Sequence, residues 1–336
     1  YARFMGEKYI VTKSKMKGVR LLGKSGEWKI YENESAASII YGTSQVMSEK
    51  NYDKLDYPYN QTTLLQKAVV PESATKQTDS IAAVDNLHNA VLQFGENSCI
   101  SEADGGYHIF AKKDIKVKAE IVSQIDINSV NTVNTENAGE NTNVANETKT
   151  DSGNRVLLLQ FKVKKDLTIW VDGNRNKLSA KQRVYYNDNT TFTYAVALEG
   201  DENQVEVTFS KGKYNLSDVE AYIATLPGTE LYESEFLQNS TKTKGNVIAG
   251  NLTMQKSGYL ITSIPYDSGF KIQVDGKNVK SEKVNTAFLG CKMKAGEHDI
   301  VITYHAPGMA AGKVMSFVGM MGFLILSVLE HVDTKK

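Results

Sequence analysis

One short segment matches a known phosphate-binding pattern. Residues 18–25 read GVRLLGKS, which fits G-x-x-x-x-G-K-S, a loop whose backbone N–H groups and lysine surround phosphate at the start of a helix. Here Gly26 and a strand-like run from Trp28 to Tyr31 follow instead of a helix. Asp172 ends an apolar run, but Gly173 follows it, so it predicts a hairpin turn rather than a metal-binding aspartate. We do not expect this segment to bind a nucleotide.

The remaining ionisable side chains form no recognisable catalytic set. The five histidines are scattered without the i, i+4 spacing of a zinc site. Cys99 and Cys291 lack metal-ligand spacing and are expected to be unrelated thiols unless the fold pairs them. Several carboxylates adjoin glycines or turns, where Asp usually caps the local backbone. These are Asp104, Asp267, Asp275 and Glu297. The sequence therefore predicts no catalytic residue, cofactor or metal.

Aromatic side chains are the best candidates for binding. Trp170 and Tyr194, with a tyrosine pair between them, could form a platform on which sugar rings stack. The alternative, which we favour, is that these rings fill cross-strand pairs and the core. The candidate glycan contacts are Trp170, Tyr185, Tyr186, Tyr266 and Asp267.

A long apolar segment closes the chain. Residues 309–329 are interrupted only by Lys313, and about 20 apolar residues are needed to cross the hydrocarbon core of a bilayer. A buried helix of a globular protein is the alternative, but such a helix usually carries a polar stripe, and this segment is apolar on every face. We predict a transmembrane helix over 309–329, with Lys313 extending its ammonium back to the headgroups.

The rest of the sequence predicts a mainly β protein. Short runs of β-formers alternate with polar turn residues, which predicts tandem β-sandwich, jelly-roll-like units. Residues 167–174 (LTIWVDGN) resemble residues 270–277 (FKIQVDGK), and a similar strand follows each, so the two units are expected to share a hairpin.

We expect five parts along the chain. Residues 1–70 form a strand pair and a short helix that link from an absent membrane region, and 71–226 form the first sandwich, with a disordered Asn- and Thr-rich loop at 128–154. Residues 227–247 form a helical connector, 248–306 the second β unit and 309–329 the transmembrane helix. The formal net charge is zero, from 39 basic and 39 acidic residues, so nucleic acid is not an expected partner. The chain begins at Tyr1 without a secretion signal, so we expect it to be a fragment or a processed product.

The C-terminal third resembles the end of the bacterial YfhO family of membrane proteins. The resemblance is carried by residues 258–270 (GYLITSIPYDSGF), 274–276 (VDG), 285–290 (NTAFLG), 295–298 (AGEH) and 304–308 (YHAPG). Residues 6–12 (GEKYIVT) and 28–33 (WKIYEN) are similar to the segment that follows the multi-span region of that family. One departure is Phe270, where Trp is common.

The resemblance implies a polytopic glycosyltransferase of the C type, which moves a sugar from a lipid-linked donor to a cell-envelope polymer such as lipoteichoic acid. Its catalytic acidic residues would precede Tyr1, and this chain would have an acceptor-positioning or structural role, with its β units outside the cytoplasmic membrane. The implied partners are the lipid bilayer, cell-envelope glycan or teichoic acid, and the upstream transmembrane region of the same protein. The alternative is a non-enzymatic, membrane-anchored surface module that binds glycan or protein.

Overall fold

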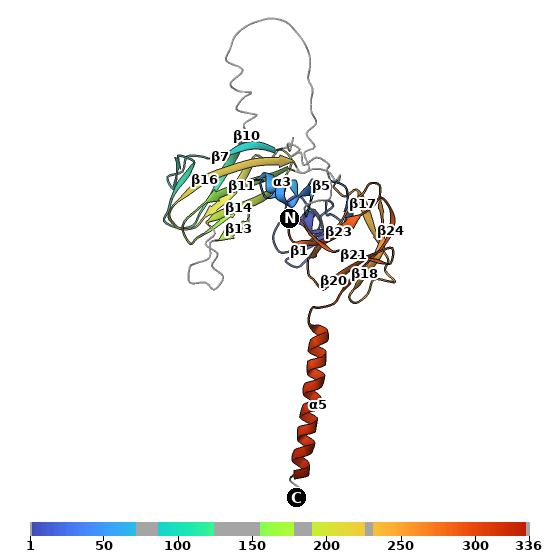
Figure 1. Ribbon diagram of the computed structural model, residues 1–336. Helices are drawn as coiled ribbons and strands as arrows, with labels where there is room; N and C mark the ends of the chain where they lie inside the picture. The colour runs from blue at the N-terminus through green and yellow to red at the C-terminus, as the bar shows by residue number, and fades with distance from the viewer. Residues whose placement is uncertain (1, 72–86, 124–154, 178–189, 226–230, 334–336) are drawn as a thin grey trace.

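The computed structural model describes residues 2–71, 87–123, 155–177, 190–225 and 231–333. It confirms a mainly β protein with one long apolar helix near its C-terminal end. Two β units lie side by side, and the helix α5 (Met309–Asp333) extends away from them (Figure 1). The predicted loop at 128–154 and the candidates Tyr185 and Tyr186 lie outside the described residues.

The first unit is a ten-stranded antiparallel sheet that curls on itself. Its main path runs β13-β12-β15-β10-β7-β16-β11-β14, and the edges approach where the Asn176 side-chain amide donates to the Thr193 carbonyl. Along strands such as β9 and β14 buried residues alternate with more exposed ones, as expected of a sheet with one face in the core. The strands are β7 (Leu87–Phe94), β8 (Ile100–Ala103), β9 (Gly106–Ala111), β10 (Ile115–Ser123), β11 (Arg155–Lys162), β12 (Thr168–Val171), β13 (Asn174–Lys177), β14 (Thr191–Leu198), β15 (Gln204–Phe209) and β16 (Gly212–Thr225).

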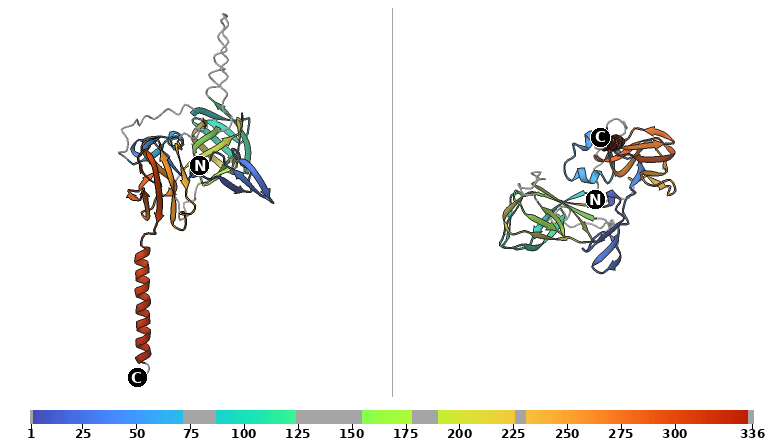
Figure 2. Two further views of the ribbon diagram at one scale, coloured as in Figure 1. Left: turned by 90° about the vertical axis from the view of Figure 1, so that its right-hand side faces the viewer. Right: turned by 90° about the horizontal axis from the view of Figure 1, so that it is seen from below.

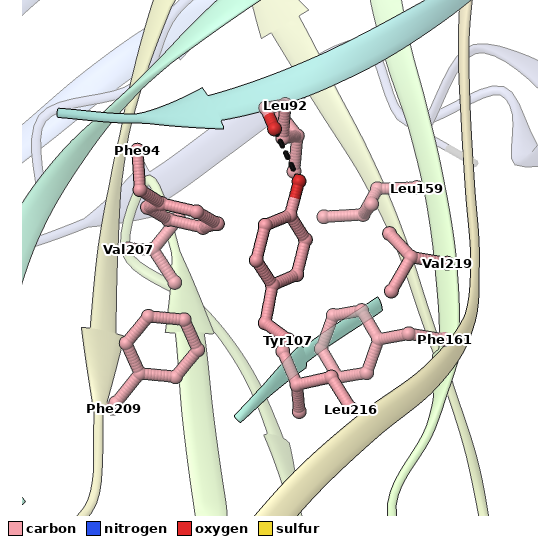
Figure 3. A pocket seen from close by; sticks show the side chains of 9 residues that line it. All are labelled: Leu92, Phe94, Tyr107, Leu159, Phe161, Val207, Phe209, Leu216 and Val219. Atoms are coloured by element: carbon pink, nitrogen blue, oxygen red, sulfur yellow. Dashed lines mark hydrogen bonds between the residues drawn. The ribbon is translucent and has the colours of Figure 1, made fainter. Parts of the chain in front are cut away.

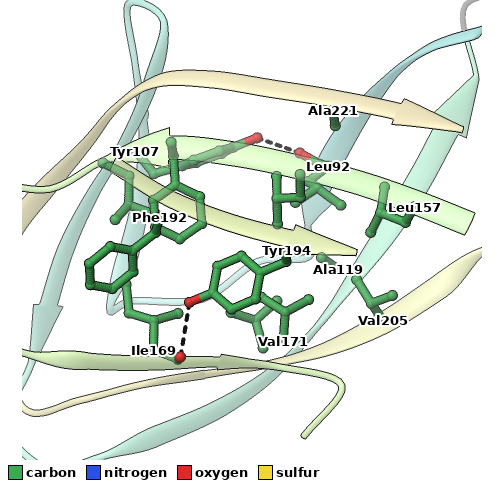
Figure 4. Close-up of a cluster of buried hydrophobic side chains, with 14 of the residues drawn as sticks. Leu92, Tyr107, Ala119, Leu157, Ile169, Val171, Phe192, Tyr194, Val205 and Ala221 are labelled. Carbon is green, nitrogen blue, oxygen red and sulfur yellow. Dashed lines mark hydrogen bonds between the residues drawn. The ribbon is translucent and has the colours of Figure 1, made fainter. Parts of the chain in front are cut away.

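The interior of the first unit is a packed apolar core that includes three buried tyrosines, Tyr107, Tyr194 and Tyr214. Figure 4 shows two of them, Tyr107 and Tyr194. The Tyr194 hydroxyl donates to the Ile169 carbonyl at 2.9 Å, and the Tyr107 hydroxyl donates to the Leu92 carbonyl. These bonds offset the cost of burying a hydroxyl, and burial raises the pKa of both tyrosines, so each remains a donor. Tyr194 is therefore a core residue rather than part of a sugar platform.

The second unit is a nine-stranded sheet folded into a sandwich, in the order β21-β20-β24-β18-β17-β4-β19-β23-β22. Its core contains Leu260, Ile272 and Ile300, all fully buried. Its strands are β4 (Ile40–Thr43), β17 (Ser234–Gln238), β18 (Val247–Met254), β19 (Gly258–Pro265), β20 (Phe270–Val274), β21 (Lys277–Val279), β22 (Glu282–Val284), β23 (Phe288–Met293) and β24 (Gly296–Tyr304).

Two expectations about this unit were wrong. The structure places β4, from the N-terminal part of the chain, between β17 and β19, so residues 1–70 do more than link. It also forms the strand β17 where a helical connector was predicted over 227–247. In β17 Ser234 and Phe236 are buried while Glu235 and Leu237 are exposed, which is a period of two. Hydrogen bonds to β4 and β18, which the local sequence does not reveal, select the strand.

The N-terminal part also contributes smaller elements. The predicted strand pair is confirmed: β1 (Tyr9–Thr12) pairs with β3 (Trp28–Glu32), and β2 (Arg20–Ser25) adds a third strand. The phosphate-loop-like segment thus forms a strand, not a loop before a helix. Helix α1 (Ala2–Met5) precedes this sheet, and β5 (Val46–Ser48), α2 (Glu49–Tyr52), α3 (Tyr59–Thr63) and β6 (Ala68–Val70) follow β4.

The described N-terminal part contacts the first unit through Lys17 and Tyr57, among other residues. The Lys17 ammonium lies 2.5 Å from an Asp172 oxygen and 2.6 Å from a Glu202 oxygen. Desolvation lowers the pKa of Lys17, but hydrogen bonds and charge attraction to these two carboxylates outweigh it and raise the pKa overall. Farther along, the ring of Tyr57 packs edge-on against Tyr222 of β16, with centroids 6.0 Å apart.

We expect Gly258→Ala to destabilise the second unit. A methyl group at Gly258 would overlap the Thr43 carbonyl oxygen, which lies on β4 and cannot move without breaking the centre of the sheet. Overpacking of this kind costs about 1–3 kcal/mol of unfolding free energy. Gly23→Ala is the matched control, because Gly23 also lies in a strand and nothing is within 4 Å of its added methyl. The unfolding midpoints of both variants are measured by thermal unfolding of the detergent-solubilised chain. Equal midpoints would contradict the close packing of Gly258 against β4.

Candidate functional site

The segment that carries the resemblance forms a tight turn at one end of the second unit. After β19, the Tyr266 amide donates to the Ala287 carbonyl at 2.9 Å. The Asp267 carboxylate accepts from the Gly269 amide at 2.7 Å, and its carbonyl accepts from the Phe270 amide at 3.1 Å. The carboxylate therefore caps a turn, as an Asp in such a position usually does.

This turn is joined to the start of the apolar helix. The His305 amide donates to the Gly269 carbonyl at 3.0 Å, and the rings of Phe270 and Tyr304 lie 4.6 Å apart. A side chain at Gly269 would overlap the His305 carbonyl oxygen, so only glycine permits this approach. At position 270, where Trp is common in the family that the sequence resembles, Phe270 provides the aromatic contact with Tyr304. Residues 266–270 and 304–305, which we call the signature loop, thus tie β19 and β20 to α5.

Helix α5 is long and apolar enough to cross a membrane. Its apolar stretch Met309–His331 has a mean hydropathy of 1.8 in its best window, and no residue of that window is buried against the rest of the described structure. Twenty-five residues span about 37 Å, against roughly 30 Å of hydrocarbon. The alternative of a buried globular helix is therefore wrong for this structure (Figure 1).

The described candidate glycan contacts do not come together. Trp170 lies in β12 of the first unit, where its neighbours Ile169 and Val171 are fully buried, so it is partly buried on the opposite face of the sheet. Tyr266 is 38% exposed and lies with Asp267 in the signature loop of the second unit. The Asp267 carboxylate already accepts a hydrogen bond from the Gly269 amide within its own turn. Among the described residues, Trp170 and Tyr266 are thus separate aromatic positions on different units.

The repeated hairpin has the same chemistry in both units. In each, an Asp and a Gly with positive φ form the turn: Asp172 and Gly173 in the first, Asp275 and Gly276 in the second. Each Asp also accepts a hydrogen bond through one carboxylate oxygen from a backbone amide of the neighbouring strand, at 3.3 and 3.0 Å. The other oxygen contacts a basic side chain, Lys17 or His298. These carboxylates fix strand ends, and sequence reasoning missed their second role because the partners are distant in the chain.

A very small void lies inside the first unit (Figure 3). Its volume is about 10 Å³, at the lower limit of the space that one water molecule needs. Phe94, Tyr107, Phe161 and Phe209 are among the nine apolar residues around it. The void is a packing gap without room for a sugar or an acyl chain. Within the part of the chain that the structure describes, no group of three or more His, Cys, Asp or Glu side chains could hold a metal ion.

Comparison with known proteins decides the family. The family model described as bacterial membrane protein YfhO matches residues 3–316. This chain belongs to the YfhO family. The match includes both β units, the signature loop and the first turns of α5, and it confirms the resemblance noted in the sequence.

A curated YfhO relative gives the extent of the match. It is the uncharacterized protein YfhO of Bacillus subtilis (strain 168), 22% identical over 309 residues, which are 88% of this chain and 34% of the relative. The chain thus spans about a third of that protein. Among solved structures, latent PorU from Porphyromonas gingivalis aligns over 85% of this chain and 26% of its own, with 9% identity and a TM-score of 0.20. That score is too low to compare folds. The membrane family and helix α5 together support membrane association.

We expect Asp267→Ala to loosen the signature loop of this YfhO chain and Asp267→Asn to preserve it. Asparagine keeps the side-chain oxygen that accepts from the Gly269 amide, whereas alanine removes it. By analogy with helix caps, the loss of such a capping bond costs about 0.5–2 kcal/mol. Hydrogen exchange at residues 266–271 and 304–309 measures the change: exchange accelerates in the alanine variant alone. Equal acceleration in both variants would mean that the carboxylate charge, not the cap, holds the loop.

Proposed function

We propose that this chain is the extracytoplasmic β region, with one membrane span, of a YfhO-type glycosyltransferase that acts on a cell-envelope polymer such as lipoteichoic acid. Its role is to position the acceptor, while the chemistry belongs to residues outside this chain. The observation that carries the proposal is the signature loop. It fixes the second sandwich to the start of α5, so the sandwich stays at the membrane surface, where a lipid-anchored acceptor begins.

The acceptor would meet this end of the molecule first. Tyr266 offers a partly exposed ring in the signature loop, which contacts the residues just before the span, and aromatic faces favour stacking with sugar rings. Trp170 provides a second ring on the first unit, where a longer polymer would pass. Asp267 contributes indirectly, because its cap orients the backbone that carries Tyr266.

Cysteine labelling in intact cells tests the sidedness of the β units. Cys99 is partly exposed in the first unit, whereas Cys291 is fully buried in the second. Burial, with a smaller contribution from the Glu282 charge, raises the pKa of the Cys291 thiol to about 12, so little reactive thiolate forms. A membrane-impermeant maleimide should therefore modify Cys99 in the full-length protein without permeabilisation, as read by peptide mass spectrometry. Cys291 should react only after denaturation. Labelling of Cys99 only after permeabilisation would place the β units in the cytoplasm.

The sugar content of envelope polymers tests the transferase role. Deletion of the gene should remove a sugar modification from one polymer, and the full-length protein should restore it. Tyr266→Ala should restore it only partly, because one stacking contact contributes about 1 kcal/mol. Tyr9→Ala is the control, since Tyr9 is 59% exposed but lies on the N-terminal sheet. Immunoblots verify equal protein levels. Unchanged polymer in the deletion strain would favour the non-enzymatic surface module.

A further inference from the structure

Several strand ends of the second unit meet where α5 begins. The antiparallel pair β18 and β24 brings Val247 opposite Thr303, two residues before His305. Strand β17 ends at Gln238, opposite Gly250 of β18, so the turn 239–246 lies at this same end. On the other side, the Ser263 amide donates to the Ile39 carbonyl at 2.9 Å, just before the signature loop. In the left view of Figure 2 α5 leaves from this end of the unit.

Two large aliphatic side chains are exposed at this end. Leu237 is 63% exposed and Ile39 is 49% exposed. The register of β17 and β4 pairs Glu235 with Tyr41, and extending it by two residues brings Leu237 opposite Ile39, which immediately precedes β4. We infer that the two side chains lie on one face. Their neighbours Phe236 and Ile40 point into the core. The acidic Glu235 is on the same face as Leu237 but two residues farther from α5.

The adjoining turn presents two lysines and is held firmly. The Asn239 side-chain oxygen accepts from the Thr241 and Lys242 amides, each at 3.1 Å. The Asn246 side-chain amide donates to the Tyr304 carbonyl at 2.6 Å, which fastens the turn beside the start of α5. Lys242 and Lys244 are both exposed, and neither forms an ion pair with a carboxylate in the described part of the chain. Their charges are therefore available to an anionic partner.

We propose that Ile39, Leu237, Lys242 and Lys244, which we call the basal patch, rest on the headgroup layer of an anionic bilayer. The patch combines aliphatic surface with cations on long alkyl stems, which is the composition that suits the membrane interface. A protein partner is less suited, because lysine is depleted from the cores of protein interfaces. The patch is also continuous with α5, so the membrane that holds the helix lies next to it. The second unit is then a body seated on the lipid rather than one tethered by a single helix.

Lipid-dependent quenching of a fluorescent probe tests this contact. The chain carries Cys99→Ser, so that buried Cys291 is the remaining native thiol, and Leu237→Cys is labelled with a nitrobenzoxadiazole dye. Lys256→Cys is the matched control, because Lys256 lies in the turn at the opposite end of β18. Both chains are placed in nanodiscs of phosphatidylglycerol or phosphatidylcholine that contain a headgroup nitroxide lipid. We expect quenching at position 237 but not at 256, and stronger quenching in phosphatidylglycerol.

Charge reversal provides the second arm. Each lysine near an anionic surface favours the seated state about fivefold, so Lys242→Glu combined with Lys244→Glu should reduce quenching at 237 in phosphatidylglycerol and abolish the difference between the lipids. A probe at Ser240→Cys repeats the measurement if the label at 237 disturbs folding. Equal quenching at 237 and 256, or none at either, would overturn the proposal. The proposal would also be overturned if the probe at position 237 were shielded from solvent only in the full-length protein. The patch would then contact the upstream region of that protein rather than lipid. None of these outcomes depends on transferase activity.

Discussion

The second unit depends on one four-residue strand from far upstream. All four residues of β4 are buried, and β4 joins β17 to β19, so among the described strands it provides the hydrogen-bonded link between the two halves of the sheet, which also pack together through the core. The fit leaves no room for side chains: added methyl groups at Gly42 or Gly258 would collide with the neighbouring strands. Because β4 lies between the N-terminal sheet and α2, the same insertion fixes where those elements sit. The stability of the second unit is therefore linked to the N-terminal part of the chain.

Short polar interactions define the geometry around this sheet. Asp172 and Asp275 have the same role in the two units. Each closes a hairpin and accepts a hydrogen bond from a backbone amide of the adjacent strand. Asp267 caps the signature loop in a related way, and Gly269 allows the close approach to His305. None of these groups needs to react with a substrate. Membership of the YfhO family and the apolar helix α5 support a membrane protein in which such contacts hold a β body in a defined position beside the bilayer.

Many elements were predictable because their signals are local. Alternating β-formers and Asp-Gly turns predicted the mainly β fold, the pairing of β1 with β3 and the repeated hairpin. Helix α5 followed from the length and uniform apolar character of 309–329, and the signature residues 258–270 gave the family. For the phosphate-loop pattern, the strand predicted from Trp28 to Tyr31 is confirmed by β3, and the segment itself lies largely in β2. The sequence left open whether Trp170 and Tyr194 form a surface platform, because a period-two pattern fits both a core position and a surface position. The burial of Tyr194 shows that its side chain lies on the core face of the sheet.

By itself the sequence determined the secondary-structure class, the turn chemistry, the apolar span and the family, since each depends on residues close together in the chain. Only the tertiary structure decided that β4 enters the second sheet, that 234–238 form a strand, and that Lys17 meets Asp172. It alone decided that Asp267 caps a turn and that Leu237 and Ile39 share one exposed face. The physical reason is that these outcomes depend on hydrogen bonds and burial between segments up to about two hundred residues apart. Local propensity cannot choose among such partners.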